Sequence, residues 1–210
     1  MKKLLLSAII IVFLSSSQAQ TLPKQMISVG LSAGYSEKLT LMSMPVTYNA
    51  QLTSAFPRLR YTAGVRQNLG FGQRKYTINN QSTLIDDISS YAINFMAGLE
   101  YISPYKLLIG FNIDLLGINV GTRSFKTIGT DPVYKINPET TNVLLGGSND
   151  KGALNSEFYL GYRMNDNITF KAGLSHYLIT LEYQNNNGKG RTQAFSTIPF
   201  IQAQYTLWQK

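Results

Sequence analysis

The sequence predicts an all-β protein, an eight-stranded antiparallel up-and-down transmembrane β-barrel. Three observations favour this fold. Apolar and polar residues alternate along most of the chain, as they do in strands with two different faces, whereas helical spacing is hard to find. The connections between these segments alternate between short turns and longer links, which is typical of a meander. The polar face of the segments carries few charges, although 44% of all residues are hydrophobic.

The amino terminus predicts export. Two lysines follow Met1, an apolar run extends from Leu4 to Leu14, and the small residue Ala19 follows a serine-rich stretch. The apolar run is about half the length that a membrane-spanning helix needs. We therefore expect residues 1–19 to be a cleaved signal peptide and residues 20–210 to form one barrel domain. The chain has no cysteine, which excludes disulfides and thiolate metal sites.

Eight segments have strand character. The polar and apolar faces are clearest in RYTAGVRQNLGFG and in the terminal IQAQYTLW. The predicted short turns are residues 54–57, 103–104 and 165–166, and the predicted longer links are residues 37–44, 75–87, 126–153 and 185–190. The predicted strands are centred on residues 26–35, 45–53, 58–74, 90–101, 105–125, 157–163, 167–174 and 201–208.

The alternation also predicts closure and two irregularities. A meander has no free edge only if its last strand pairs with its first, so residues 201–208 should pair with residues 26–35. Outward positions are odd up to residue 115, whereas the next apolar residue, Leu116, is even, which predicts a bulge. A similar change of phase predicts a second bulge between Leu174 and Tyr177.

The composition of the polar face indicates that it lines the interior. Glycine, serine, threonine and asparagine predominate there, whereas a water-exposed face would carry more lysine and glutamate. Small residues suit a narrow eight-stranded interior. Buried charges must be paired, so we expect a plugged lumen with an ion-pair network formed by Arg60, Arg66, Glu100, Asp114, Glu157, Arg163 and Lys171.

Aromatic residues flank two of the predicted short turns, and the single tryptophan lies near the carboxyl terminus. Aromatic belts mark the membrane interfaces of such barrels. We expect an aromatic girdle formed by Tyr101, Tyr105, Tyr162, Phe170 and Trp208.

On these residues the chain resembles the small outer-membrane β-barrel proteins of Bacteroidota, with the eight-stranded OmpA/OmpX-like architecture. The resemblance rests on the MKK…SSSQAQ leader, on RYTAGVRQNLGFG and NSEFYLGYRMNDNITFKAGLSHYL, and on the terminal IQAQYTLW. It covers about residues 26–208 and implies an outer-membrane location without shared catalytic residues. Barrels of this kind typically end on an aromatic residue, whereas here Gln209 and Lys210 follow Trp208.

Catalytic candidates are few. The only histidine, His176, follows Ser175, but neighbouring strand residues face opposite sides of a sheet. A lipid-modifying enzyme that uses these residues with Glu182 is therefore the least favoured alternative. Asp86 and Asp87 suit a solvated turn, and the GGSNDKG stretch lacks the spacing of a phosphate loop. We expect no catalytic, cofactor or metal site.

The predicted partners are outer-membrane lipid and lipopolysaccharide. Charged residues make up only 14% of the chain, despite a formal net charge of +8, which disfavours nucleic acid. We expect a non-enzymatic monomer with a structural or interaction role, whose 126–153 loop could bind a protein partner. A narrow channel and a soluble lipocalin-like lipid binder remain open as alternatives. The cations expected to face lipopolysaccharide are Arg74, Lys75, Lys189 and Arg191.

Overall fold

The computed structural model describes residues 22–36, 39–78, 82–128, 133–185 and 188–210. This part of the chain is almost entirely β-strand and contains no α-helix; its one helical element is a 3-10 turn, η1 (Gly147–Asn149). No helix in these ranges is long and apolar enough to cross a membrane. The strands are β1 (Gln25–Ser36), β2 (Leu39–Gln51), β3 (Leu59–Ile78), β4 (Ser82–Ile102), β5 (Leu107–Ile128), β6 (Val133–Pro138), β7 (Thr141–Val143), β8 (Ala153–Arg163), β9 (Ile168–Asn185) and β10 (Gly188–Gln209).

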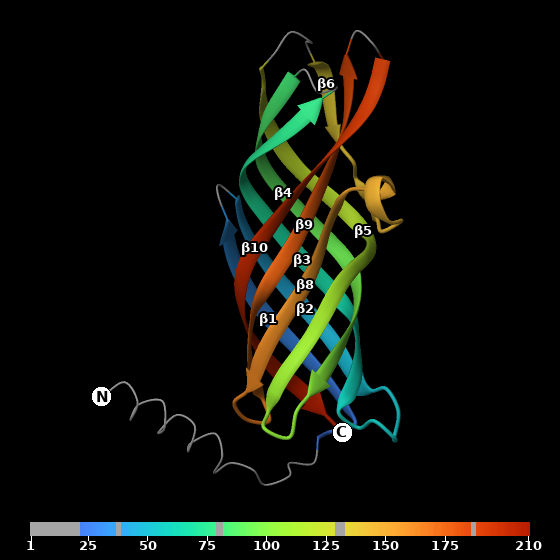
Figure 1. The fold of residues 1–210 in the computed structure, drawn as a ribbon, viewed down its shortest axis with the longest axis vertical. Helices are drawn as coiled ribbons and strands as arrows, with labels where there is room; N and C mark the ends of the chain where they lie inside the picture. Colours follow the sequence, from blue (N-terminus) through green and yellow to red (C-terminus); the bar gives the residue numbers. More distant parts are fainter. Residues whose placement is uncertain (1–21, 37–38, 79–81, 129–132, 186–187) are drawn as a thin grey trace, which may run out of the picture.

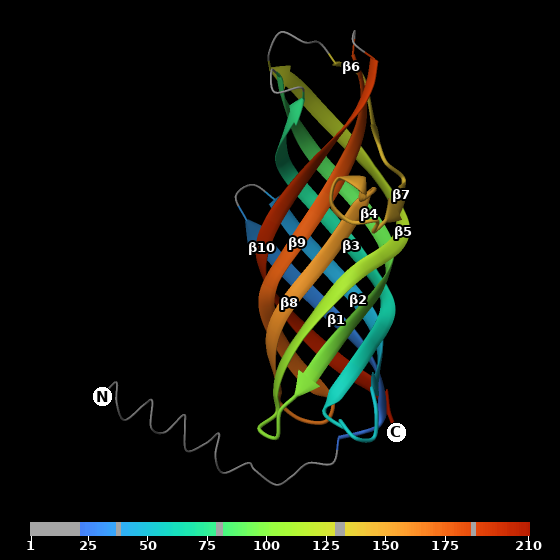
Figure 2. The same ribbon diagram turned by 45° about the vertical axis from the view of Figure 1, so that its right-hand side comes forward.

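An antiparallel up-and-down sheet closes into a ring of eight strands. The order is β1, β2, β3, β4, β5, β8, β9 and β10, and β10 pairs with both β9 and β1. Figures 1 and 2 show tilted strands around an upright axis, with the carboxyl terminus at the same end as the turns after β2, β4 and β8. We call this end the turn rim. The predicted pairing of the last strand with the first is confirmed, with Ile201 opposite Ala33 and Tyr205 opposite Val29.

The predicted 126–153 loop contains the end of β5, all of β6 and β7 and the first residue of β8, so that prediction was wrong in part. β6 pairs with β9 as far as Pro138, which lies opposite Leu181, and β8 takes over this edge of β9 at Ala153. Together β6 and β8 therefore form one interrupted strand. The intervening residues leave this edge of β9: β7 pairs instead with β5, and a bridge between Val143 and Lys151 closes a hairpin that carries η1 at its tip (Figure 1).

Three other predicted links are also shorter than expected. β2 begins at Leu39, so most of residues 37–44 belong to a strand rather than to a link. β3 and β4 remain paired up to Ile78 and Ser82, and β9 and β10 up to Asn185 and Gly188. The reason is physical: backbone hydrogen bonds between strands do not depend on a contrast between an apolar and a polar face, so strands continue beyond the alternation.

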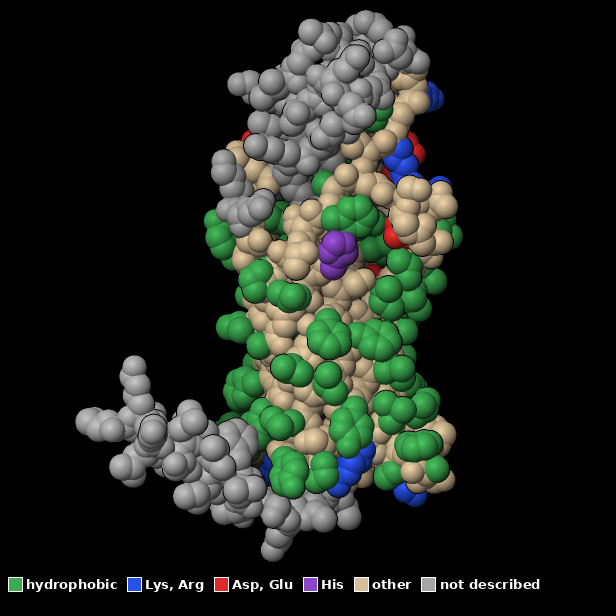
Figure 3. Space-filling view, in the orientation of Figure 1, with side chains coloured by type: hydrophobic (Ala, Val, Ile, Leu, Met, Phe, Trp, Pro, Cys, Tyr) green, Lys and Arg blue, Asp and Glu red, His purple; other side chains and the backbone are tan. Residues whose placement is uncertain are grey.

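The two faces of the ring differ sharply in chemistry. Large apolar side chains cover the outer surface from the turn rim to about the level of His176, as Figure 3 shows for one side. Polar and charged side chains, together with glycines, fill the inside of the same strands. The inner face holds, among others, the buried residues Ser28, Ser32, Thr47, Asn49, Thr62, Asn68, Asn94, Asn112, Gln202 and Thr206.

One predicted bulge is confirmed and the other is wrong. Phe95 pairs with Leu116 and the next residue with Asp114, so Leu115 has no partner on β4. β9, by contrast, pairs with both neighbours without a register shift. Tyr177 therefore points inward in regular alternation. The change in the apolar pattern arises because the interior itself becomes apolar at this level.

Candidate functional site: a packed polar interior

The centre of the interior is a buried arginine held by two carboxylates. Arg66 extends from β3 and is fully buried. Its Nε and Nη2 donate to one oxygen of Asp114 at 2.9 and 2.6 Å, and Nη1 lies 2.6 Å from a carboxylate oxygen of Glu157. Nη2 also donates to the carbonyl of Asn155 at 2.6 Å. The arginine on β3 and its partners on β5 and β8 come from three strands, so the cluster crosses the ring.

The second oxygen of Asp114 is also fully used. It accepts hydrogen bonds from the side-chain amides of Asn68 at 3.0 Å and Asn94 at 2.7 Å, and from the backbone N–H of Asn155 at 2.9 Å. The bulge at Leu115 directly follows this aspartate and turns the next two side chains outward. A buried charge is tolerated only with such a complete set of partners.

A second ion pair lies closer to the turn rim. Lys171 donates to Glu100 at 2.8 Å, and its ammonium group lies 4.3 Å from the centre of the Tyr159 ring. The Tyr159 hydroxyl donates to the same glutamate oxygen at 3.1 Å. The lysine is thus stabilised by a carboxylate and by the face of an aromatic ring.

Two of the cations expected in this network lie elsewhere. Arg60 donates to the carbonyls of Pro23 at 2.7 Å and Asn49 at 3.3 Å, and so binds the chain that enters β1. Arg163 donates to the carbonyl of Asp166 at 3.0 Å and binds the turn after β8. Alternation assigned both arginines to the inner face, but it could not resolve their height along the axis. They stabilise the turn rim rather than pair with the central acids.

An apolar layer that sequence reasoning missed lies above the ion pairs. It contains Leu39, Leu41, Ala92, Ala153, Tyr177, Ile179 and Ile198, all buried. The Tyr177 hydroxyl lies 2.9 Å from Ser90 Oγ, which satisfies its one polar group. The sequence did contain one indication of this layer: Leu39 and Leu41 lie at alternate positions with Ser43, so the three side chains share the inner face of β2. The buried polar pairs and this apolar layer thus occupy successive levels of the described interior.

A third charged cluster lies on the outer side of the wall, beyond the apolar band. Glu139, in the link between β6 and β7, forms an ion pair with Arg191 of β10 at 2.8 Å. It also accepts hydrogen bonds from the Thr180 hydroxyl at 2.7 Å and from the backbone N–H of Gly152 at 2.9 Å. Arg191 donates to the carbonyl of Ser148 at 3.1 Å. These contacts hold the β7–η1 hairpin against β9 and β10.

Burial by itself raises the pKa of Glu139, but the hydrogen bonds from Thr180, Arg191 and Gly152 outweigh it and lower the pKa below the usual glutamate value. Because this pKa is depressed in the folded state, the ionised carboxylate stabilises the folded hairpin at pH values above the ordinary glutamate pKa. The stabilisation is lost as the pH falls through the depressed pKa.

We therefore expect hydrogen exchange at the Gly152 amide to accelerate as the pH falls into the acidic range. Exchange rates are corrected for the intrinsic effect of pH and compared between the wild type and Glu139→Gln. The variant should exchange faster at neutral pH and lose the acid-dependent step. An acid-dependent step that persists in Glu139→Gln would assign it to another group.

The predicted girdle residues lie at or near strand ends beside the turn rim. Tyr101, Tyr105, Phe170 and Trp208 are exposed on the outer face, and Tyr162 is half-buried. Of the expected loop cations, Lys189 is exposed, whereas Arg191 binds Glu139. The side chains of Arg74 and Lys75 fall outside the described residues, as does the predicted signal peptide.

The enzyme candidates do not form a catalytic pair. Ser175 is buried and donates to Asn155, whereas His176 lies outside and stacks on Phe195 with ring centres 5.1 Å apart. Asp150 accepts hydrogen bonds from the backbone N–H groups of Leu145 and Gly146, which fixes the glycine-rich turn. Within the described ranges, no group of three or more histidine, aspartate or glutamate side chains could hold a metal ion.

Comparison with known proteins adds no family. No family model matches the chain. No curated protein matches it either. The geometry of the ring, its interior and its outer surface therefore carries the functional argument.

Proposed function

We propose that this protein is an outer-membrane β-barrel with a plugged polar lumen and a non-enzymatic structural or interaction role. The observation that carries the proposal is the inversion of the two faces. Ile201, Leu207 and Leu31 are 70, 61 and 58% exposed, whereas the Arg66 and Asp114 side chains are fully buried. A water-soluble protein rarely exposes so large a contiguous apolar surface. In a membrane barrel, this face meets lipid and the polar face fills the lumen.

The same inversion disfavours a lipocalin-like binder. Such a barrel would place leucine, isoleucine and phenylalanine around an internal cavity, whereas Phe111, Phe158 and Leu160 point outward here. A channel is disfavoured because the Arg66 cluster and the apolar layer around Tyr177 occupy the interior. We expect no steady single-channel conductance in planar bilayers.

Cysteine labelling tests the membrane placement directly, because the chain has no cysteine of its own. Phe158→Cys on the outer wall and Phe56→Cys in the turn after β2 start from almost equally exposed side chains. In protein unfolded in urea before labelling, both cysteines should react with a water-soluble maleimide reagent. In vesicles that are leaky to the reagent but keep their bilayer, only the Phe56→Cys variant should react. Equal reaction of both in vesicles would contradict the proposal.

Lipopolysaccharide is the partner that the exposed Lys189 and the predicted loop cations Arg74 and Lys75 favour, because ammonium and guanidinium groups bind phosphate. Replacing Arg74, Lys75 and Lys189 together by glutamine should weaken binding to lipopolysaccharide. Arg191 is left unchanged in this variant because it holds Glu139. The control replaces Lys24, Lys106 and Lys210, three lysines at the turn rim, and should bind like the wild type. Equal binding by all three proteins would exclude this partner site.

A further inference from the structure

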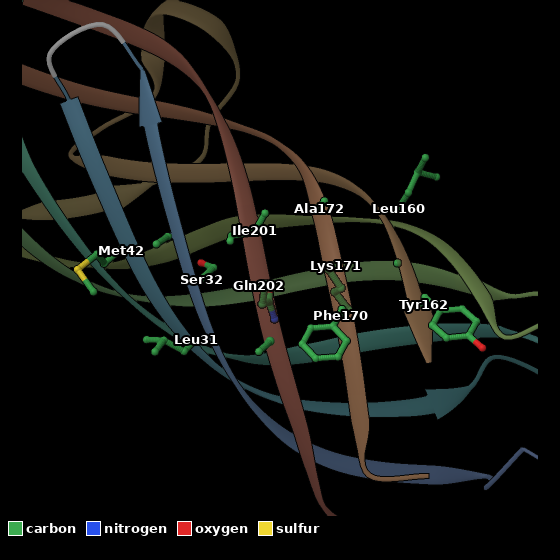
Figure 4. Close-up of a pocket in the computed structure, with 13 residues that line it drawn as sticks. Leu31, Ser32, Met42, Leu160, Tyr162, Phe170, Lys171, Ala172, Ile201 and Gln202 are labelled. Atoms are coloured by element: carbon green, nitrogen blue, oxygen red, sulfur yellow. The ribbon is translucent and has the colours of Figure 1, made fainter. Parts of the chain in front are cut away.

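Within the described residues, one strand of the wall is interrupted by an insertion. Elsewhere the inward and outward side chains alternate along continuous strands; in the region shown in Figure 4, Phe170 lies on the outer face and Gln202 is buried inside. Between β6 and β8, by contrast, the chain leaves β9 at Glu139 and returns at Gly152. The Glu139 N–H donates to the Thr180 carbonyl at 3.5 Å, and the Thr180 N–H donates to the Gly152 carbonyl at 3.0 Å. Both feet of the β7–η1 hairpin therefore meet at one residue of β9.

The inner side of the hairpin is tied to the Arg66 cluster. Asn142, the middle residue of β7, is fully buried. Its side-chain amide donates to Asn94 Oδ1 at 2.6 Å, and its Oδ1 accepts a hydrogen bond from the Ala153 N–H at 2.8 Å. Asn94 in turn donates to Asp114 at 2.7 Å. A chain of hydrogen bonds thus runs from the hairpin to the carboxylate that holds Arg66.

The outer side of the hairpin is held by two side chains of β10. Arg191 and Gln193 both donate to the carbonyl of Ser148, at 3.1 and 3.2 Å. Both also donate to the carbonyl of Asp150. The Arg191 guanidinium is itself fixed by the Glu139 carboxylate at 2.8 Å. We call this ion pair the latch, because it positions the arginine that binds the tip of the hairpin.

Little backbone pairing holds the hairpin between its two sides. β7 pairs with β5 over only three residues, and its other neighbour is Lys151 of the same hairpin. Gly152, at one foot, has a φ of 75°, a conformation that glycine adopts readily. Segments with few backbone hydrogen bonds open locally at a lower free energy than core strands. The hairpin is therefore the part of this wall whose closure depends most on side-chain contacts.

We propose that the β7–η1 hairpin is a strap that opens outward as one unit when the latch between Glu139 and Arg191 is lost. Opening withdraws Asn142 from Asn94 and exposes one side of the Arg66 cluster to water. The inference rests on the proposed function, because the strap acts as a gate only if the polar interior is a plugged lumen.

Acid is the condition that releases this latch, since protonation of Glu139 removes the ion pair with Arg191. Three other charged side chains belong to the elements around it. Asp150 accepts hydrogen bonds from backbone N–H groups of its own turn, and Lys151 is an exposed residue of the hairpin. Glu182, on β9, is exposed and lies opposite Arg191 in the strand register. Glu182 is therefore the matched control for Glu139.

Cysteine accessibility in vesicles tests the opening. Ala153→Cys places a thiol behind the hairpin, because Ala153 is fully buried and its N–H binds Asn142. The probe is dithiodipyridine, which also reacts with thiols in acid. The thiol should be protected at neutral pH and react in acid. Adding Glu139→Gln should speed its reaction at neutral pH about tenfold, because hydrogen bonds to a charged group are lost. Adding Glu182→Gln should change nothing.

Hydrogen exchange needs no thiol and shows whether the hairpin moves as a unit. The amides of Asn119 and Leu144 bond between β5 and the hairpin, and that of Ala153 binds Asn142. All three should exchange faster, at one common rate of opening, in Glu139→Gln. Faster exchange at Gly152 alone would mean local loosening and would overturn the strap. Equal thiol protection in the Glu139→Gln and Glu182→Gln backgrounds would overturn it as well.

Membrane insertion of each protein is measured first by heat-modifiable gel mobility. A wild type that does not insert would refute the proposed function. An inserted wild type whose hairpin amides remain equally protected in Glu139→Gln would refute the strap alone.

Discussion

Replacing Arg66 by alanine should lower the free energy of unfolding by about 3–5 kcal/mol, because two buried carboxylates would lose their shared cation. Asp114 would keep its amide donors, but Glu157 would lose its ion pair. The measurement is urea-induced unfolding in lipid vesicles, followed by the fluorescence of Trp208 and by gel mobility.

Arg58→Ala is the matched control for this prediction. Arg58 is half-buried near the turn rim, and its guanidinium donates to the carbonyl of Ile102 at 3.4 Å. Its loss should cost no more than about 1 kcal/mol. If Arg66→Ala does not fold, Arg66→Lys can replace it, because lysine retains the charge but cannot contact both carboxylates in the same way. Its midpoint of urea-induced unfolding should lie below that of the wild type and of Arg58→Ala. Equal stabilities of the Arg66 and Arg58 variants would show that the central cluster does not stabilise the ring.

The second large effect is expected on the outer wall. Ile201→Arg should destabilise the protein in a bilayer by about 2–4 kcal/mol, the cost of a cation near the middle of the hydrocarbon region. On the surface of a soluble protein, the same change would usually cost less than about 0.5 kcal/mol. The two environments therefore predict clearly different results for one variant.

Phe56→Arg provides the comparison, because Phe56 is an exposed aromatic residue in the turn after β2. Its replacement should leave the unfolding midpoint nearly unchanged. The double comparison is made in the same vesicles with the same denaturant. A tolerated arginine at position 201 would mean that this face does not meet hydrocarbon.

The sequence pattern was most informative where one face is apolar and the other polar. The terminal IQAQYTLW stretch predicted both which side chains of β10 point inward and that β10 pairs with β1. A one-residue slip in this pairing would exchange the environments of all its side chains. The same logic located the bulge at Leu115, where the apolar phase changes between odd and even positions.

The pattern failed where the contrast between the faces disappears. Tyr177 and Ile179 point into an apolar interior. The apolar residues of β9 therefore change from the outer to the inner face at this level, and this change was misinterpreted as a bulge. The far ends of β3 and β4 and of β9 and β10 remain paired through backbone hydrogen bonds, which residue types do not record. The interruption between β6 and β8 requires a long-range choice of partner for β9, which local alternation does not contain.

Site residues show a related limit. Alternation indicates that Arg60, Arg66 and Arg163 share the inner face, but partner choice depends on the stagger of neighbouring strands. The stagger brings Arg66 to Asp114 and Glu157 and leaves the other two at the turn rim. The Glu139–Arg191 pair joins a link to a distant strand and has no local signature.

The most direct test of the membrane-barrel account is whether residues 20–210 require an amphiphile to fold. Unfolded protein is diluted from urea into buffer alone or into buffer with phospholipid vesicles, and folding is followed by heat-modifiable gel mobility and protection from protease. The account predicts a compact, protease-resistant form only with vesicles, because the exposed apolar wall needs lipid. A folded, monomeric and soluble protein in buffer alone would contradict it.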